Sequence, residues 1–406
     1  MRLTELALQR AGAADLEEFQ RREGLYPSGQ EDILTMQGHL AALLGYERYM
    51  VKPGDTYYFD LSAMGIPGTV NDALPDKTMH YVPFTYAGTV DAYKLTSERE
   101  TTEEYAQQNK YPHSLFVADY AVTHTISWGG LNDEGLIFGK NYASGGVDYT
   151  LRAPSVGSDC TGLDDSQRGV PQSNEWDRIL DKDDGYIKNC GEVHSWGQDT
   201  DSSLLVNRAR RGYNSARNGS DWNATWSRSG IGFRPVLEVL NPKTLGADGL
   251  KAITLDLGGG KLGNSSEDIQ IIVKNGESFT APASDGLTRP DGNTGSYFMW
   301  LGSDGKLYAP GANVPADVTK LTAQWRDIAV PTGEIKIAEN GWKSFFNTIT
   351  FDLFFKDTQT VTVTAADNSG ETVTVEYLLS DKALTESELA RMTFTAYSAP
   401  FSINPD

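Results

Sequence analysis

The chain has 406 residues, too long for one ordinary domain, so about two to four domains are expected. Hydrophobic residues make up 39% of it and aromatic residues 10%, which can fill several cores and excludes a disordered protein. The formal net charge of -20 argues against general binding to nucleic acids or anionic membranes, because both require an excess of Lys and Arg.

Residues 1–50 predict two short helices. The second begins at the capping-box pattern Ser28-Gly-Gln-Glu31, in which a hydroxyl and a carboxylate satisfy free amide groups, and it ends at Gly45. Apolar residues at helical spacing mark both segments: Leu3, Leu6, Leu16 and Phe19, then Ile33, Met36, Leu40, Leu43 and Leu44. Two interpretations stay open: packing on a neighbouring domain, or an oligomerisation or docking element. The stripe is too short for a self-sufficient coiled coil.

Residues 51–240 predict a domain of short strands and loops that is rich in Tyr, Gly, Asp and Trp. Strands and loops are expected over three segments, 55–65, 80–95 and 113–123. The clearest helix, 174–182, would turn three apolar side chains inward, namely Trp176, Ile179 and Leu180. The sequence Asn241-Pro-Lys marks the boundary of this domain.

Residues 250–326 predict a small β-sheet domain. It begins with a strand at 251–260 and finishes with another at 319–325. Between them, apolar runs are split by Asn-Gly and Asp-Gly, the dipeptides that favour tight hairpin turns.

Residues 331–406 predict a second small β module. Strict polar–apolar alternation over 358–379, on either side of Asn368-Ser-Gly, predicts a hairpin with one buried face. A short helix is expected over 385–392, with Thr385 as its N-cap and a carboxylate three residues later as the capping partner.

Four segments of the first large domain occur in a distinctive order: LRAPSVGS (151–158), NEWDRIL (174–180), RARRGY (208–213) and GFRPVLEV (232–239). This order resembles the C-type-lectin-like fold of the formylglycine-generating-enzyme family, with its Glu-Trp helix and closing Gly-Phe-Arg. Within that fold, the polar stretch before Gly232-Phe-Arg is most similar to variable proteins of diversity-generating retroelements. The match covers about the second half of residues 51–240.

Two further resemblances concern the C-terminal modules. Residues 246–328 look like an internalin-type B repeat (a Listeria–Bacteroides repeat), a β-grasp module closing on Ala-Gln-Trp. Residues 331–406 resemble Ig-like repeats of gut Firmicutes surface and phage proteins. Together with 41 glycines, these resemblances imply a multi-domain chain, mainly β with some α. Its expected parts are short N-terminal helices (1–50), a C-type-lectin-like α+β domain (51–240), a β-grasp-like repeat (246–328) and an Ig-like β-sandwich (331–406).

The retroelement resemblance implies a set of variable surface residues. Because these systems substitute template adenines, an Asn codon can become Ser, Asp, Gly, Thr, Tyr and others, but not Lys, Glu, Gln, Met or Trp. Residues 214–230 contain no Lys, Glu, Gln or Met. Trp222 and Trp226 would require another codon, for example AGG changed to TGG, or would be fixed residues. The expected ligand-binding residues are Cys190, His194, Asn207, Asn214, Asn218, Gly219, Ser220, Asp221, Trp222, Asn223, Trp226, Ser227, Arg228, Ser229 and Gly230.

The composition of this stretch also suits a binding surface. Tyr and Trp provide rigid contact area, while Ser, Gly and Asn provide adaptable hydrogen bonding. Within 204–240, six arginines stand against Asp221 and Glu238, which favours an acidic or glycan-bearing ligand. The alternatives without a binding role are an ordinary turn at 218–221 and core packing of the two tryptophans. Four nearby residues are expected to hold the fold instead: Arg211, Tyr213, Phe233 and Arg234.

The sequence offers little support for an enzyme active site or a metal site. The formylglycine-generating enzymes use a pair of cysteines near the C-terminal end of the domain, whereas this chain has only Cys160 and Cys190. We expect two free thiols, and a disulfide bridge between the two cysteines stays open as the alternative. The histidines lack metal-ligand spacing, and the acidic run at 181–185 fits no EF-hand, so neither a metal nor a cofactor is expected.

The sequence therefore predicts a non-enzymatic ligand-binding protein, on a phage particle or a bacterial surface. Its partner would be a protein or a glycan on a target cell, with homo-oligomers possible and no nucleic acid. The alternative is a structural phage-tail or surface protein without a specific ligand. No apolar run approaches the roughly 20 residues that span a bilayer, and the acidic N-terminus does not resemble a signal peptide. The chain would then stay in the cytosol until assembled or released, or lack its export signal.

Overall fold

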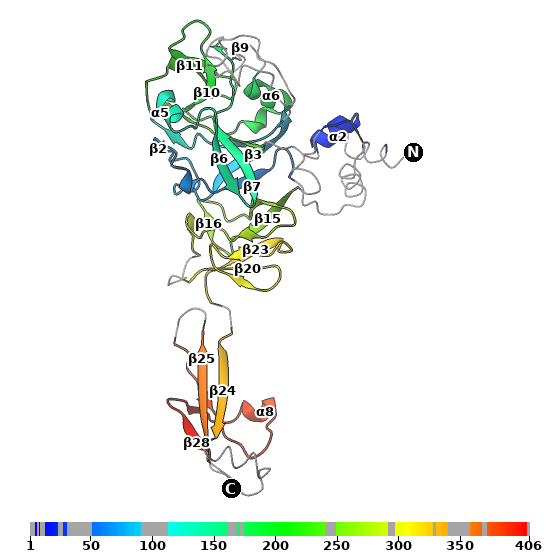
Figure 1. Ribbon diagram of the computed structural model, residues 1–406, viewed down its shortest axis with the longest axis vertical. Helices are drawn as coiled ribbons and strands as arrows, with labels where there is room; N and C mark the ends of the chain where they lie inside the picture. Colours follow the sequence, from blue (N-terminus) through cyan, green and yellow to red (C-terminus); the bar gives the residue numbers. More distant parts are fainter. Residues whose placement is uncertain are drawn as a thin grey trace. The chain divides into compact units, whose positions relative to one another are not determined.

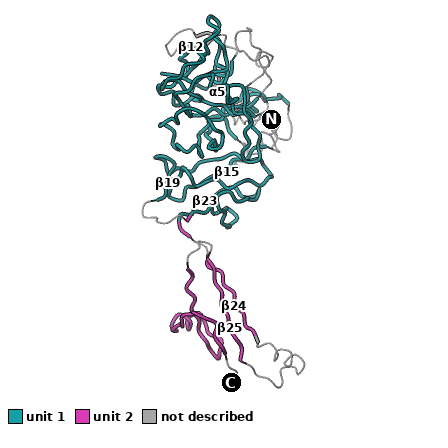
Figure 2. The backbone as a smooth tube through the Cα atoms, turned by 60° about the vertical axis from the view of Figure 1, so that its left-hand side comes forward, with its two compact units in different colours: residues 1–294, 298–325 teal, residues 295–297, 326–406 magenta. Residues whose placement is uncertain are grey.

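The computed structural model describes residues 5, 8, 13–22, 27–30, 51–90, 113–160, 169–170, 174–239, 249–290, 297–327, 330–339, 358–367 and 372–403. The chain is mainly β, with 39% strand and 11% helix, as the composition predicts. It divides into two compact units, residues 1–294 with 298–325 and residues 295–297 with 326–406 (Figure 2). Among the described helices, none has the length and apolar character needed to cross a membrane.

The first sheet of unit 1 has six antiparallel strands. In spatial order they are β1 (Thr56–Phe59), β3 (Val82–Val90), β4 (His113–Ala118), β14 (Val236–Val239), β7 (Val147–Arg152) and β6 (Lys140–Ser144). Every residue of β3, β4 and β14 is buried, because hydrophobic clusters cover both faces of these central strands. These strands confirm the predictions over 55–65 and 113–123 and, as far as residue 90, the one over 80–95. Residues 91–95 lie outside the described residues.

The second sheet of unit 1 also has six strands. In spatial order they are β12 (Gly219–Asn223), β11 (Asn207–Arg211), β10 (His194–Thr200), β13 (Ile231–Phe233), β5 (Thr123–His124) and β2 (Thr69–Val70). β10 and β13 run parallel, and the other neighbours run antiparallel. Because β13 lies in this sheet and β14 lies in the middle of the first one, residues 231–239 join the two sheets.

Two helices with side-chain caps pack beside these sheets (Figure 1). α5 (Trp128–Asp133) starts at Ser127, whose hydroxyl accepts from the amide of Gly130. α6 (Glu175–Lys182) starts at Asn174, whose side chain accepts from the amide of Asp177. The predicted helix at 174–182 and its inward side are confirmed, because three side chains are buried: Trp176, Ile179 and Leu180.

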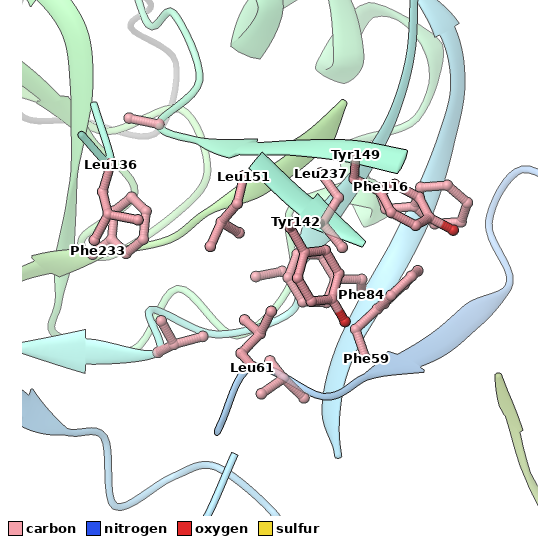
Figure 3. Close-up of a cluster of buried hydrophobic side chains, with 14 of the residues drawn as sticks. Phe59, Leu61, Phe84, Phe116, Leu136, Tyr142, Tyr149, Leu151, Phe233 and Leu237 are labelled. Atoms are coloured by element: carbon pink, nitrogen blue, oxygen red, sulfur yellow. The ribbon is translucent and has the colours of Figure 1, made fainter. Parts of the chain in front are cut away.

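Aromatic rings fill the core beneath the first sheet (Figure 3). The ring of Phe59 makes edge-to-face contacts with Phe84, Phe116 and Tyr149, at centroid distances of 5.2, 5.3 and 5.5 Å. Such pairs contribute about 0.5–1.5 kcal/mol each beyond the area they bury. The core therefore gives the 51–239 module a rigid base.

The second module of unit 1 spans residues 249–325. Its five-stranded sheet has the order β17 (Ile269–Lys274), β15 (Leu250–Asp256), β23 (Lys320–Gln324), β20 (Met299–Gly302) and β21 (Leu307–Tyr308). This confirms the predicted first and last strands and the turns between them, where Gly276 and Gly305 each have φ of +79°. Trp325 closes the core by donating from its indole nitrogen to Leu257 O at 2.8 Å.

The two modules of unit 1 are packed directly on one another. Lys274 N donates to Gly145 O at 2.6 Å, and the hydroxyl of Tyr81 donates to Ala283 O. A Cβ atom on Gly145 would lie only 2.3 Å from Ile272 O, so the backbones approach more closely than a side chain permits. The predicted boundary at Asn241 lies outside the described residues, and the 249–325 module is part of the same compact unit as 51–239.

Unit 2 holds a three-stranded sheet, β24 (Thr332–Glu339), β25 (Gln359–Ala366) and β28 (Phe401–Ile403), and a pair, β26 (Glu376–Tyr377) with β27 (Thr395–Ala396). The predicted hairpin over 358–379 is wrong. Both edges of β25 are occupied, by β24 on one side and β28 on the other, and Val363 N donates to the hydroxyl of Tyr397. α8 (Glu386–Leu389) confirms the predicted helix and its capping box with Thr385.

The N-terminal segment is described only in part. α2 (Leu16–Arg22) confirms a helix around Leu16, and the side chain of Phe19 is buried. Leu3, Leu6 and the helix predicted after Ser28 lie outside the described residues, and so does Glu31 of the capping box. The hydroxyl of Ser28 accepts from the amide of Gln30.

Candidate functional site

A buried network of charges fixes α6 against the first sheet. Glu175 accepts two hydrogen bonds from the guanidinium of Arg152, at 2.8 and 2.5 Å. Arg152 Nε donates to Glu238 at 2.6 Å, and His113 Nε2 lies 2.7 Å from Glu175 Oε1. Burial raises the pKa of Glu175, but the charge of Arg152 and the hydrogen bonds outweigh it and hold this pKa well below its ordinary value. Each buried charge in the network thus has a partner.

Arg211, the last residue of β11, links the second sheet to α6. Its guanidinium is fully buried and donates to Asp177 Oδ1 at 3.1 Å and to Val156 O at 3.2 Å. The following residue, Gly212, lies against the ring of Trp176 with φ of +84°, a conformation that favours glycine. These contacts confirm the prediction that Arg211 belongs to the scaffold.

The Gly232-Phe-Arg segment is also structural, as predicted. Arg234 is buried, and its guanidinium donates to Ala118 O at 2.7 Å and to Asn189 O at 3.0 Å. Phe233 is fully buried, and a Cβ atom on Gly232 would lie 2.2 Å from Thr123 O. The segment after residue 230 therefore holds the two sheets together.

β12 forms the free edge of the second sheet and pairs with β11 along its whole length. Opposite residues of an antiparallel pair point to the same face. One face of this pair therefore carries Arg208, Arg210, Ser220 and Trp222. Arg210 Nη2 donates to Ser220 Oγ at 3.1 Å, and on the opposite face Asn207 Nδ2 donates to Asp221 Oδ2 at 2.6 Å.

Two arginines and two tryptophans lie together in a group, the Arg–Trp cluster (Arg210, Trp222, Trp226 and Arg228). The indole rings lie 5.5 Å apart, and the guanidinium of Arg210 lies 4.6 Å from the ring of Trp222. Arg228 lies 5.4 Å from one indole and 5.6 Å from the other. Trp222 is half-buried and packs on the core, whereas Trp226 is exposed, so the two tryptophans differ in their surroundings.

The expected binding residues fall into three classes of exposure. The exposed residues are Asn214, Trp226, Ser227, Arg228 and Ser229. The half-buried residues are Cys190, Asn207, Ser220, Asp221, Trp222, Asn223 and Gly230. The buried residues are His194, Asn218 and Gly219.

These three buried residues are corrections to the predicted surface. His194 stacks on Tyr213, with ring centroids 4.8 Å apart, and Nδ1 of His194 is enclosed. Asn218 O accepts from Gly212 N at 2.9 Å, at the turn that leads into β12, and Gly219 pairs with Arg211. Close packing against β11 thus removes all three from contact with a ligand in this arrangement.

An aliphatic loop that was not expected from the sequence, Leu204–Val206, is exposed to solvent. Its side chains are 51%, 61% and 55% exposed, and Trp226 is 49% exposed. In the described part of unit 1, no other large hydrophobic side chain is exposed. The signal was present as three consecutive apolar residues between polar segments, but such a run is more often the buried part of a strand. The loop adjoins β12, because Ala224 N donates to Val206 O at 3.0 Å.

A cavity of about 690 Å³ lies between the two modules of unit 1 and includes Tyr58, Asp60, His80, Tyr142 and Ile271 in its lining. None of the expected binding residues lines it. A second cavity, of about 380 Å³, contains Cys190 and Arg217, with the Arg217 guanidinium bonded to Asp184 at its edge. Of the expected binding residues, only Cys190 lines either of these two cavities.

Cys190 carries a free thiol, and the side chain of Cys160 is not described. Burial raises the pKa of Cys190, although the charge of Arg234 opposes this, so little thiolate is present at neutral pH. Among the described residues, no three or more His, Cys, Asp or Glu side chains are grouped to hold a metal ion. The observed chemistry of the site is stacking, apolar contact and positive charge.

The end of unit 1 that carries β11 and β12 lies away from β15 and β23 of the second module (Figure 1, Figure 2). Comparison of the chain with protein-family models, with curated proteins and with solved structures gave no significant match, so the evidence for function is the geometry itself.

Proposed function

We propose that this chain is a non-enzymatic ligand- or receptor-binding protein. Residues 51–239 would be a C-type-lectin-like domain whose surface is diversified by a retroelement, displayed on a phage particle or a bacterial surface. One observation carries the proposal: the exposed large apolar side chains of unit 1, within the described residues, lie in the two loops that adjoin β12. Exposed apolar groups gathered at one place are typical of interaction sites.

The construction of the site supports this function. The residues behind it, such as Arg211 and Arg234, are buried and hydrogen-bonded, while Ser227, Arg228 and Ser229 are exposed. Substitutions in exposed loops cost little stability when the core lies elsewhere. A surface built in this way can therefore change its residues without unfolding the domain.

The remaining modules would support this surface. The 249–325 module, which we propose to be β-grasp-like, packs closely on the first module and would act as a rigid base. Unit 2 would be an Ig-like spacer or accessory binder.

The test uses the full chain on arrays of glycans and of bacterial surface proteins. The triple variant Trp226→Ala, Ser227→Ala, Arg228→Ala should lose binding to the ligand found, with a melting temperature within a few degrees of the native chain. The exposed Lys261→Ala, in the second module, is the control and should bind as the native chain does. Unchanged binding by the triple variant would contradict the proposal, and binding to no array would favour the structural alternative.

A genomic observation tests the retroelement separately. We expect a reverse-transcriptase gene nearby and a near-copy of the segment coding for residues 190–234 that differs at adenines. If neither is present, the surface is not diversified in this way, whatever it binds.

A further inference from the structure

The aliphatic loop, Leu204–Val206, lies outside the residues expected to vary, yet it continues the same surface. The hydrogen bond from Ala224 N to Val206 O joins it to the end of β12. Trp226 N donates to Asn223 O at 3.1 Å, in the turn that follows β12. The aliphatic loop and the exposed indole thus lie on the two segments that meet at the end of β12.

The aliphatic loop is held in its shape by buried polar groups. The carboxylate of Asp201, which is 3% exposed, accepts hydrogen bonds from Ser203 N at 2.9 Å, Ser203 Oγ at 2.7 Å and Leu204 N at 2.6 Å. Arg208 Nη1 donates to Leu205 O at 2.9 Å, while its guanidinium stacks on Trp128 at 4.4 Å. A loop ordered in advance loses little conformational entropy when it binds.

Arg228, two residues after Trp226, supplies an exposed positive charge. Its guanidinium lies over the faces of two indole rings. No carboxylate among the described residues pairs with it. The local positive charge contrasts with the net charge of -20 of the chain.

A protein surface fits this combination better than a glycan does. Burying sugar hydroxyls against three aliphatic side chains would cost their hydrogen bonds to water, because the loop side chains offer no polar atoms in return. Protein interfaces, in contrast, have an apolar centre, and Trp and Arg are prominent among the residues that supply their binding energy.

We infer that the ligand is a protein presenting apolar side chains beside carboxylates, and that Leu204–Val206 anchors it. The inference rests on the proposed ligand-binding function. It adds that part of the affinity comes from residues outside the variable set. This part would be common to all variants of the surface, and the variable residues would decide which protein is accepted.

The probes are three matched sets of immobilised synthetic peptides, tested with the full chain. The first set has a central run of Leu and Phe flanked by Asp and Glu, the second replaces the acids by Lys, and the third replaces the apolar run by Ser. The native chain should bind the first set at least tenfold more tightly than either of the others. The triple variant Leu204→Ser, Leu205→Ser, Val206→Ser should lose at least tenfold in affinity, and so should Arg228→Glu.

Two control variants and one reserve variant accompany these measurements. Ile335→Ser removes a 67% exposed aliphatic side chain from unit 2, and Lys261→Glu reverses an exposed charge of the second module. Both should bind the peptides as the native chain does. If the triple variant does not fold, Leu205→Ser alone removes the most exposed side chain of the three and should still weaken binding severalfold.

The outcomes separate the inference from the proposed function. If the native chain binds the three peptide sets equally, or binds none of them, the inference is wrong. If the glycan array shows a ligand that Trp226→Ala loses and the triple loop variant keeps, the ligand-binding function stands and the protein partner is wrong. If neither peptides, glycans nor surface proteins bind, both fail together.

Discussion

His194 should make the stability of unit 1 fall at mildly acidic pH. Burial lowers the pKa of His194 from 6.5 to about 3, with a smaller contribution from the charge of Arg210. In the unfolded chain this imidazole takes up a proton below pH 6.5, whereas in the native chain it stays neutral. The native state therefore loses stability as pH falls below 6.5, and the loss levels off below pH 3. At about 1.4 kcal/mol per pH unit, the loss at pH 5 is about 2 kcal/mol.

The variant His194→Phe removes this titration while keeping an aromatic ring to stack on Tyr213. We expect the free energy of unfolding of the variant to rise relative to the native chain by about 2 kcal/mol between pH 7 and pH 5. Urea unfolding followed by tryptophan fluorescence, at pH 7, 6 and 5, measures it. Tyr213→Phe is the matched control, because it keeps both the stack and the imidazole.

Parallel pH profiles of the native chain and His194→Phe would refute the reasoning. They would mean that the imidazole is protonated in the native state, so that Nδ1 reaches water or a carboxylate. If the parallel profiles were separated by a constant amount, with the variant more stable, that offset would reflect apolar packing alone.

Three other substitutions test structural contacts in the two units. Glu175→Gln removes the charge that faces Arg152 in the buried network and should lower the free energy of unfolding by about 3–5 kcal/mol in the same urea assay. Gly145→Ala places a Cβ atom against the second module at φ of +58° and should cost at least about 1–2 kcal/mol, seen as faster hydrogen exchange in β17; unchanged exchange would contradict the close approach. Thr385→Ala removes the cap of α8 and should cost about 1 kcal/mol in the unfolding of unit 2.

Local patterns in the sequence were sufficient for several elements. The helix α6 follows from the capping side chain of Asn174 and from apolar residues at helical spacing. The turns at Gly276 and Gly305 follow from Asn-Gly and Asp-Gly, because only a few residue types accept positive φ. In each of these cases, residues close in the chain determine the conformation.

Strand partners are not local. The alternation over 358–379 correctly indicates strand at β25, but its neighbours come from β24 and β28, at distant positions in the chain. Period-2 alternation specifies which face of a strand is apolar and not which strand lies beside it. A hairpin prediction therefore fails when other strands occupy both edges.

The candidate site shows the same division. The sequence by itself located the stretch before Gly232, its aromatic and arginine content, and the structural residues after it. Only the tertiary structure decided that His194 and Asn218 are buried and that Leu204–Val206 is exposed. The physical reason is that exposure depends on which segments pack above a residue. Apolar side chains remain in water where polar anchors such as Asp201 hold the backbone at the surface.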